Sequence, residues 1–222
     1  MQKQGEPARK MVVFDMDNTL LQNRFIEVCA EEFKFKQALS LLRQIDFDQT
    51  SLTQRIASFL KGKKRSELLH IASSIPLVPD IHEVIVRLRE RSYIIGIISD
   101  SYQVITEMVA KKIDADFELA NELQFVGDHS TGEVLIPSYF HYSPYSSCKH
   151  QVCKTNALRF ICRTYNVRLK DCLVVGDSDN DACMLAHAGM SVAFCTTSEL
   201  LKSIAKKHIV KCSFSELLMY AL

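Results

Sequence analysis

Four short segments of this 222-residue sequence carry side chains that could together transfer a phosphoryl group. They are residues 15–19 (Asp-Met-Asp-Asn-Thr), Ser99, Lys154 and residues 176–181 (Gly-Asp-Ser-Asp-Asn-Asp). Carboxylates can attack phosphorus and form an aspartyl-phosphate, and ammonium or hydroxyl groups bind phosphate oxygens. If folding brings the four segments together, they supply the groups that phosphoryl transfer needs.

The spacing within the first segment suits a nucleophile and a proton-handling group. Asp15 and Asp17 are two residues apart, so at an extended strand end both side chains point to the same side. One carboxylate there can attack phosphorus while its neighbour gives or takes a proton. An acidic turn after a strand would look the same in isolation. A calcium loop fits worse, because its sixth position requires glycine and Leu20 stands there.

The second carboxylate cluster indicates magnesium rather than calcium. Carboxylates alternate over residues 177–181 as in a calcium loop, but Ala182 and Ala188 stand where that loop requires glycine and glutamate. Carboxylates placed opposite Asp15 would instead complete an octahedral oxygen site for Mg²⁺, which keeps water and phosphate oxygens as further ligands. The metal would offset the repulsion between an anionic nucleophile and an anionic phosphate.

Three of the four segments follow runs of aliphatic residues that are typical of buried strands. Residues 11–14 precede the first segment, residues 94–98 precede Ser99, and residues 173–175 precede the last. Because ligand sites of open parallel sheets gather at the carboxyl ends of strands, we expect these segments to meet at one edge. Ser99 and Lys154 carry little weight alone, since such serines often cap helices and most lysines are exposed.

The chain as a whole predicts an α/β fold, a doubly wound parallel (Rossmann-like) sheet with a small helical cap inserted after the first strand. Between residues 24 and 75, apolar residues recur at helical spacing and no convincing strand appears. We expect two domains, a Rossmann-like core of residues 1–23 and 76–222 and a cap of residues 24–75.

After Pro79, strands and helices alternate, as a parallel sheet requires. Asp80 and Glu83 form a capping-box-like start to the first of these helices. Residues 123–136 predict a β-hairpin, placed before the last third of the chain, that turns between Gly127 and Gly132. The expected helices are residues 102–112, 154–165, 180–187 and 198–206, and the expected strands are 93–99, 117–120, 172–176, 192–194 and 208–210.

The composition excludes several classes of protein. Apolar residues make up 47% of the chain, enough for a buried core, and the 24% of charged residues is ordinary. A formal net charge of +1 gives no reason to expect nucleic acid as a partner. Residues 1–10 lack the apolar stretch of a secretory signal, and no segment is apolar enough to span a bilayer. We therefore expect a cytoplasmic protein without nucleic-acid or membrane partners, and the oligomeric state is left open.

The eight cysteines do not indicate a disulfide framework. Disulfide frameworks belong to small secreted domains, which this chain does not resemble. In apolar or helical patterns, a reduced thiol behaves as a small hydrophobic side chain. Five cysteines lie in such patterns: Cys29, Cys162, Cys172, Cys183 and Cys195.

A group of potential zinc ligands lies just before Lys154. It consists of His141, Cys148, His150 and Cys153. Their spacing matches no standard pair of zinc ligands closely. We interpret them as ordinary loop residues and leave metal binding there open.

In this order, the four segments resemble the motifs of the haloacid dehalogenase-like hydrolases. The first matches the Asp-x-Asp-x-Thr pattern of the phosphatase members, and the last matches Gly-Asp-x-x-Asn-Asp. The helical insertion after the first motif is also similar, so the resemblance covers nearly the whole chain. The chain looks most like the phosphoserine phosphatase branch. Residues similar in kind and place are 47–49, Leu52, Arg55 and Ile56 in the cap, and 120–123 before the hairpin.

The resemblance implies a Mg²⁺-dependent phosphomonoester hydrolase that acts on a small metabolite through an aspartyl-phosphate. Asp15 would be the nucleophile, and Asp17 would protonate the leaving oxygen and then activate water. The carboxylates of Asp15 and Asp177 and the backbone carbonyl of Asp17 would hold Mg²⁺. Ser99 and Lys154 would bind phosphate oxygens, and Lys154 would also neutralise Asp15.

The resemblance also implies supporting residues. Asp181 would orient Lys154 or a metal-bound water, Asn180 would touch the phosphate, and Arg55 would bind a substrate carboxylate. Since every catalytic position is intact, a catalytically silent binding module is a remote alternative. A phosphotransferase that passes the phosphoryl group to an alcohol would use the same residues and stays an alternative.

Arg24 departs from the phosphoserine phosphatase pattern. The family has a glutamate there, nine residues after the nucleophile, which binds the substrate ammonium. An arginine about 4 Å from an ammonium is repulsive by on the order of 1–4 kcal/mol. Arg24 and Arg55 together would favour a substrate with an anionic or hydrogen-bond-accepting far end. Alternatively, Arg24 turns to solvent and only starts the cap helix.

Asp100 is the second departure, because the family usually has glycines after the motif serine. A carboxylate beside bound phosphate is unfavourable unless it points away. The Ser99-Asp100 pair, with Cys153 before Lys154, is also similar to phosphoethanolamine and phosphocholine phosphatases of the same superfamily. Their substrates are cationic, which Arg24 argues against. The resemblance therefore leaves the substrate open.

Overall fold

The chain folds around one seven-stranded sheet, in a computed structural model that describes residues 9–45 and 48–221. The strand order is β4-β3-β2-β1-β5-β6-β7, and every pair is parallel except β3 and β4. The predicted doubly wound parallel sheet is confirmed. The strands are β1 (Lys10–Phe14), β2 (Tyr93–Tyr102), β3 (Phe117–Val126), β4 (His129–Leu135), β5 (Cys172–Gly176), β6 (Met190–Phe194) and β7 (Lys207–Ile209).

The centre of the sheet is the place where the strand order reverses. β1 pairs with β2 on one side and with β5 on the other. The chain builds outward through β2, β3 and β4 on the first side and through β5, β6 and β7 on the second. In open α/β sheets, ligands bind outside the carboxyl ends of the strands at such a reversal point. The first and last motifs directly follow β1 and β5, so they lie at this point.

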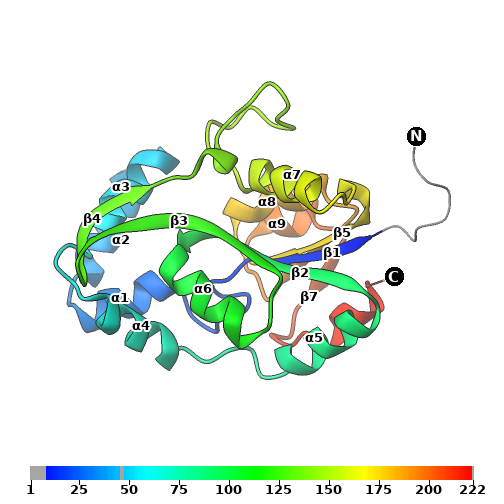
Figure 1. Cartoon of the computed structure of the whole chain (residues 1–222), viewed down its shortest axis with the longest axis horizontal. Helices are drawn as coiled ribbons and strands as arrows, with labels where there is room; N and C mark the ends of the chain where they lie inside the picture. The colour runs from blue at the N-terminus through cyan, green and yellow to red at the C-terminus, as the bar shows by residue number, and fades with distance from the viewer. Residues whose placement is uncertain (1–8, 46–47, 222) are drawn as a thin grey trace.

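Helices cover both faces of the sheet, because side chains along β1 point alternately to the two faces. Val12 and Phe14 join one apolar cluster, and Met11 and Val13 join the other. The first cluster packs against α5 (Ile81–Glu90), α6 (Gln103–Lys112) and η4 (Ser215–Met219). The second packs against α7 (Lys154–Thr164), α8 (Ala182–His187) and α9 (Glu199–Ile204). Figure 1 shows α7, α8 and α9 together on one side and α5 on the other.

The segment after β1 forms the expected helical cap. Its helices are α1 (Phe25–Glu32), α2 (Lys36–Ile45), α3 (Gln49–Ser58) and α4 (Arg65–Ser74), and its described residues contain no strand beyond one isolated bridge at Lys64. Phe47 of the family-like cap motif lies outside the described residues. Buried cap residues belong to the same apolar cluster as one sheet face. The division into a core and a cap domain stays a prediction.

The predicted hairpin exists, but its turn is shorter than expected. β3 runs unbroken from Phe117 to Val126, and only two residues separate it from β4, so the turn is not spread over residues 127–132. Gly132 lies within β4, where its φ is +78° and a Cβ atom would approach the Lys61 side chain to 2.8 Å. Gly132 is therefore not part of the turn; its lack of a side chain allows β4 to come close to the cap.

The expected capping box at the start of α5 is wrong. α5 begins after Asp80, but the Asp80 carboxylate makes no cap hydrogen bond. Its Oδ2 instead accepts a hydrogen bond of 2.6 Å from the Ser213 hydroxyl, which comes from the C-terminal segment. A tertiary contact has replaced the local one, and Asp80 ties the chain end to the core.

Cys195 is not a reduced thiol as the sequence suggested. It forms a disulfide with Cys212, and the two Cα atoms are 5.1 Å apart, within the range that a disulfide can bridge. Cys195 follows β6 and Cys212 follows β7, and these strands are neighbours in the sheet. Parallel pairing brings the two residues together, a proximity that a separation of 17 residues does not reveal.

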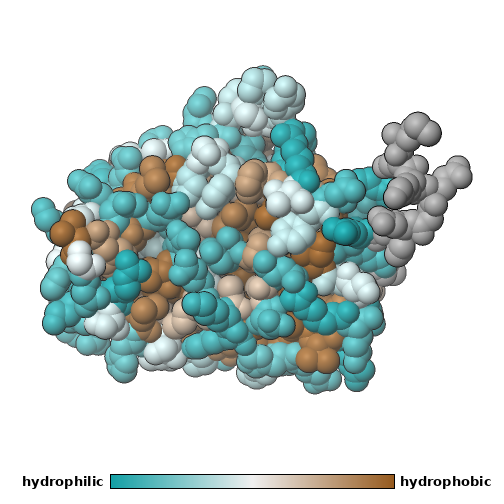
Figure 2. Space-filling model, viewed as in Figure 1, coloured by the Kyte–Doolittle hydropathy of each residue, from teal (hydrophilic) through white to brown (hydrophobic). Residues whose placement is uncertain are grey.

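The outer surface is mixed. Figure 2 shows hydrophobic residues in separate patches with hydrophilic residues between them on the visible face. Within residues 9–45 and 48–221, no helix has the length and apolar character needed to cross a bilayer.

Candidate active site

Asp15 and Asp17 lie at the carboxyl end of β1, buried under the start of the cap. Asp15 continues the sheet by one more backbone bond, its N–H donating to the Val175 carbonyl at 2.9 Å. Asp17 Oδ1 accepts a hydrogen bond of 2.8 Å from the N–H of Phe25, the first residue of α1. The residue after it, Asn18, has a φ of +57°, which asparagine tolerates better than most residues. This turn redirects the chain from the sheet into the cap.

Lys154 joins three of the four sequence segments in one buried contact. Its Nζ donates to Asp15 Oδ1 and to Asp181 Oδ1, both at 2.7 Å, and lies 3.8 Å from Asp100 Oδ1. The lysine side chain is only 4% exposed. A buried ammonium is costly unless it is paired, and here it has three acidic neighbours.

Asp181 is held by the turn that carries it. Its Oδ2 accepts hydrogen bonds from the backbone N–H groups of Asp177 at 3.1 Å and Ser178 at 3.2 Å. Gly176 makes this possible, since a Cβ there would lie 2.6 Å from the Asp181 carboxyl group. Both Asp181 oxygens are thus engaged, which fits the expected role of orienting Lys154.

Asp177 has an oxygen with no protein partner. Its Oδ2 accepts from Asn18 Nδ2 at 3.3 Å and lies 3.7 Å from Arg24 Nη2. Its Oδ1 is buried and has no hydrogen-bond partner among the described residues. Carboxylate oxygens of Asp15, Asp177 and Asp181 lie within 4.8 Å of one another. An orphaned carboxylate oxygen beside a second carboxylate fits a Mg²⁺ ligand set, which uses hard oxygen donors.

The charges in the site shift its acid–base behaviour. Burial, and then the nearby Asp181 carboxylate, raise the pKa of Asp15 well above its usual value. Burial raises the pKa of Asp17 to about 6, although the Phe25 N–H opposes the shift. Burial lowers the pKa of Lys154, but Asp15, Asp181 and Asp100 outweigh it and hold the pKa well above its usual value. Asp17 can therefore carry a proton near pH 6, as a general acid must.

The second motif lies within β2 rather than after it. Ser99 is fully buried, and its Oγ accepts a hydrogen bond of 3.1 Å from the Ser101 N–H. Asp100 does not point away from the site, although a carboxylate beside bound phosphate would be repelled: its Oδ1 lies 3.8 Å from Lys154 Nζ. Its Oδ2 accepts from Asn180 Nδ2 at 2.5 Å, and Lys154 and Arg24 oppose the effect of burial and lower its pKa. Asn180 is therefore engaged with Asp100 in this structure.

A cavity of about 690 Å³ lies between these residues and the cap. Arg24 lines it, with a side chain 31% exposed, so the residue both precedes α1 and faces the site. Among the described residues, those that line the cavity include Arg43 of α2 but not Arg55 of α3, which is exposed. Arg43 forms an ion pair with Glu27 of α1. The cap thus presents two guanidinium groups to the cavity, but the second comes from Arg43.

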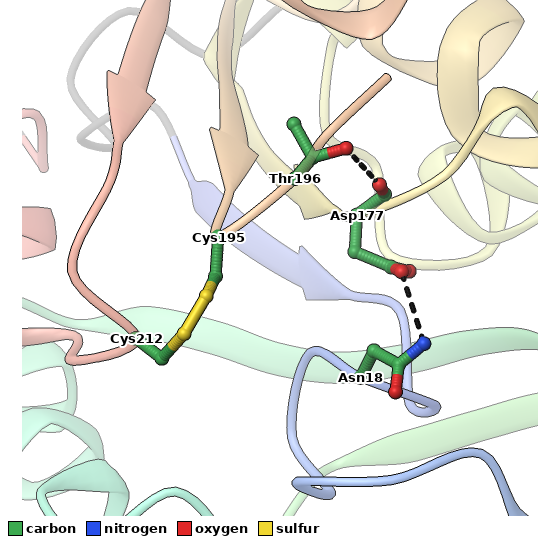
Figure 3. The surroundings of a disulfide bond; sticks show 5 residues. All are labelled: Asn18, Asp177, Cys195, Thr196 and Cys212. Carbon is green, nitrogen blue, oxygen red and sulfur yellow. Dashed lines mark hydrogen bonds between the residues drawn. A yellow bond between two sulfur atoms is a disulfide. The ribbon is translucent and has the colours of Figure 1, made fainter.

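Besides Arg43, sequence reasoning missed Thr196, which supports the site. Thr196 donates from its hydroxyl to the Asp177 backbone carbonyl, and the Cys195–Cys212 disulfide adjoins it. Figure 3 shows Thr196 on the backbone side of Asp177 and Asn18 on its carboxylate side. Thr196 follows β6 at the same sheet edge as the motifs, and this position after a strand could have identified it as a site residue. Arg43 offers no such signal, since nothing in its sequence context separates it from a surface arginine.

Three of the four potential zinc ligands lie close together, and Cys183 takes the place expected for His141. Ligand atoms of Cys148, His150 and Cys153 lie within 4.8 Å of one another and of Cys183 in α8. His141 is not part of this group, and its Nε2 lies 3.1 Å from the Ile136 carbonyl. The interpretation of Cys183 as a simple helix-pattern residue is therefore incomplete.

Comparison with known proteins agrees with this geometry. Residues 145–214 match the family model of a haloacid dehalogenase-like hydrolase. The phosphoserine phosphatase of Methanocaldococcus jannaschii is 27% identical over 225 residues, which cover 97% of this chain and 99% of that protein. The phosphoserine phosphatase of Campylobacter jejuni subsp. doylei is 30% identical over 202 residues, which cover 88% of this chain and 91% of that protein.

Comparison of the fold with solved structures also finds phosphoserine phosphatases. A solved structure of a phospho-aspartyl intermediate analogue of phosphoserine phosphatase matches with a TM-score of 0.82 and 25% identity, over 97% of this chain and 100% of that one. Motifs, topology and relatives agree across nearly the full length. The chain therefore belongs to the haloacid dehalogenase-like hydrolases, in their phosphoserine phosphatase-like branch, and is a phosphoester hydrolase of that type.

Proposed function

We propose that the protein is a Mg²⁺-dependent phosphomonoester hydrolase that works through an aspartyl-phosphate on Asp15. The observation that carries the proposal is the buried contact of Lys154 with Asp15 and Asp181, each at 2.7 Å. A lysine so placed offsets the charge of the attacking carboxylate and offers further N–H donors to phosphate oxygens. Ser99 and Asn180 are our proposed further phosphate contacts.

The residues support two successive displacements at phosphorus. In the first, an Asp15 oxygen bonds to phosphorus, the bond to the ester oxygen breaks, and Asp17 gives its proton to that oxygen. In the second, water attacks the same phosphorus, Asp17 takes a proton from it, and the bond to Asp15 breaks. Inorganic phosphate and the alcohol are released, and both aspartates return to their starting states.

Asp15 and Asp177, with the Asp17 backbone carbonyl, are the proposed Mg²⁺ ligands. Asp177 Oδ1, which has no partner among the described residues, supports this assignment, because a metal would satisfy it. When bound, the ion would offset the negative charge gathered from phosphate and carboxylates. Asp181 is better assigned to Lys154, since both of its oxygens are already engaged.

The proposed substrate is a small phosphomonoester with an anionic group at its far end. Phosphoserine phosphatase relatives act on a small phosphate ester. In this chain, Arg24 and Arg43 line the cap side of the cavity. Because guanidinium groups bind carboxylates and repel ammonium groups, this cavity favours an acid without an amine. The substrate contact predicted for Arg55 finds no support in the cavity lining, and it stays only a prediction.

A trapping experiment tests the proposed chemistry. The protein is mixed with a reactive aryl phosphate and Mg²⁺, quenched in acid within milliseconds, and treated with borohydride, which converts an acyl phosphate to an alcohol. We expect homoserine at residue 15 and nowhere else by mass spectrometry. Hydrolysis without any modified aspartate at this position would contradict the proposal. The share of phosphate that added alcohols capture would then separate hydrolase from phosphotransferase.

A cytoplasmic location, the absence of nucleic-acid and membrane partners, and the two-domain division stay predictions from the sequence.

A further inference from the structure

A second group of potential metal ligands lies beside the phosphatase site, around the start of α7. It consists of Cys148, His150, Cys153 and Cys183, whose ligand atoms all lie within 4.8 Å of one another. We propose that these four residues form a structural zinc site. The first three come from the segment that leads into α7, and the fourth lies in α8.

The donor set and its dimensions favour zinc. Three thiolates and one imidazole form one of the usual closed zinc sets, and four protein ligands leave no open position for catalysis. With zinc–sulfur bonds of about 2.3 Å, neighbouring sulfurs of a tetrahedral site are about 3.8 Å apart. Donor atoms already within 4.8 Å need only small rotations to reach this geometry. The same soft donors exclude Mg²⁺, which requires oxygen ligands, so the two sites select different metals.

The thiols already interact with one another. The sulfur atoms of Cys148, Cys153 and Cys183 lie within 4.8 Å of one another, close enough for the charge of one to affect the others. The Cys153 sulfur also lies 3.4 Å from Thr155 Oγ1 and close to His150. In this contact the Cys153 thiol donates to Thr155 Oγ1; once the thiol loses its proton to bind a metal, the hydroxyl can donate to the sulfur instead and hold it in place.

The segment that carries three of the ligands is held by polar contacts more than by apolar burial. Arg159 Nη1 donates to Ser147 Oγ at 2.6 Å, and the Tyr142 N–H donates to the Gln151 carbonyl at 2.8 Å. Residues 141–153 form an excursion that projects from the body of the molecule at the top of Figure 1. Its base is closed by the bridge between His141 and Val152 and by the Cys153 N–H donating to Phe140 at 2.9 Å. Further out, Tyr145 is 68% exposed. Where apolar burial is small, a metal with four protein ligands can supply the missing stabilisation.

Zinc at the proposed site would hold Lys154 in position. Cys153 directly precedes Lys154, and Cys183 is the second residue after Asp181. Zinc would therefore link the start of α7 to α8 next to the 2.7 Å contact between Lys154 and Asp181. We assign the four ligands a positioning role, since none of them touches Asp15 or Asp177 in the contacts of the site.

The nearby His141 supplies a matched control. It lies in the same segment as His150 but bonds the Ile136 carbonyl and is not part of the cluster. His150→Gln and His141→Gln therefore remove the same group from inside and outside the proposed site. Cys183→Ser tests the ligand that comes from α8, at a position that is only half-buried.

The experiment measures bound metal in the full chain. Wild type and the three variants are expressed with added zinc, purified in the presence of a reductant, and analysed by mass spectrometry under native conditions. We expect one zinc per chain in wild type and in His141→Gln, and at least a tenfold lower zinc content in Cys183→Ser and His150→Gln. Equal zinc in all four proteins, or wild type free of zinc with two of these cysteines oxidised to a disulfide, would overturn the proposal.

Cobalt substitution adds a readout that does not depend on activity or on stability of the variants. Co²⁺ titrated into metal-free wild type should produce thiolate-to-metal charge-transfer absorption and the intense visible bands of a tetrahedral complex. Circular dichroism of each variant confirms that it is folded before titration. A folded Cys183→Ser protein should show weaker charge-transfer absorption, whereas wild-type spectra typical of octahedral, oxygen-bound cobalt would contradict a sulfur site.

Discussion

At the scale of single residues, the site contains more negative than positive charge. Lys154 faces Asp15, Asp181 and Asp100, and Arg24 contacts Asp177. Such an excess is unfavourable for an anionic substrate unless a cation is added, which is why we assign Mg²⁺ to this edge. Each carboxylate nevertheless has its own environment, and this allows separate tests of their roles.

Asp15→Asn should abolish turnover and leave the fold intact. An amide cannot attack phosphorus, but it is close to the carboxylate in size and can still accept a hydrogen bond from Lys154. We expect activity to fall by more than about a thousandfold, because the covalent route is lost. Thermal unfolding followed by circular dichroism checks the fold. A folded variant that retains more than a tenth of wild-type activity would show that the nucleophile lies elsewhere.

Arg24→Glu should improve the hydrolysis of phosphoserine. The change replaces a repulsive charge near the substrate ammonium by an attractive one, and we expect kcat/KM to rise by about tenfold to a hundredfold, or roughly 1.4–2.8 kcal/mol. A phosphate ester with a carboxylate and no amine should lose activity in the same variant. Steady-state kinetics with both substrates measures the switch.

Arg55→Glu is the matched control for this test. It makes the same charge change in the cap, at an exposed residue outside the cavity lining. We expect little effect on either substrate. If Arg55→Glu shifted the preference and Arg24→Glu did not, then the substrate contact predicted for Arg55 from the family resemblance would be correct.

At the scale of elements, the contact between α6 and β3 contains a carboxyl group with an unusual pKa. Burial raises the pKa of Glu118 in β3 to about 7, while the Thr106 hydroxyl of α6 donates to it at 3.0 Å. Between pH 4.5, the ordinary pKa of a glutamate, and about pH 7, the folded state therefore keeps a proton on Glu118 that the unfolded chain has lost. The contribution of Glu118 to stability should therefore fall as pH rises between these two values and stay level above about 7.

Glu118→Gln should remove this pH dependence. Glutamine keeps an acceptor for Thr106 but cannot ionise, so the melting temperature should match wild type near pH 4 and exceed it at pH 8. Glu122→Gln, in the same strand, makes the same charge change without touching Thr106 and controls for net charge. A melting-temperature difference between Glu118→Gln and wild type that is equal at both pH values would show that the carboxyl group is not buried as described.

Elements whose signal is local could be predicted from the sequence. The aliphatic runs before Asp15 and Asp177 predicted β1 and β5, and helical spacing predicted the cap. The single long strand β3 was expected as two pieces, because Asn121 interrupts its apolar pattern. That asparagine is buried and donates to the Asp100 carbonyl at 2.7 Å, a partner from the neighbouring strand. Only the folded sheet supplies this bond, so no local rule could foresee it.

The same limit explains the missed site residues. Cys183 looked like a helix residue because its partners lie about 30 positions earlier, and the parallel crossover that joins them is set by the whole fold. Arg43 and Arg55 occupy neighbouring cap helices, and only packing decides which of them faces the cavity. By contrast, the proposed roles of Asp15 and Lys154 rest on motif order and sheet topology, both of which can be read from the sequence.

At the scale of the whole molecule, the site lies where three independent parts meet. The sheet supplies Asp15 and Asp177, α7 supplies Lys154, and the cap supplies Arg24. Large apolar clusters on both sheet faces hold these parts, so the fold does not depend on the charges in the site. Removing a metal should therefore affect catalysis much more than folding.

Chelation with EDTA should abolish activity at once, and added Mg²⁺ should restore it. The protein should stay folded, with a melting temperature that rises with Mg²⁺ concentration because the ion binds only the native site. Ca²⁺ should restore little activity, since it prefers more ligands at 2.3–2.6 Å instead of about 2.0–2.1 Å and would displace the phosphate from Asp15. Zinc content measured in parallel separates the two metals: loss of activity on brief EDTA treatment with the zinc retained assigns the effect to the oxygen site. Full activity in excess EDTA would remove Mg²⁺ from the mechanism.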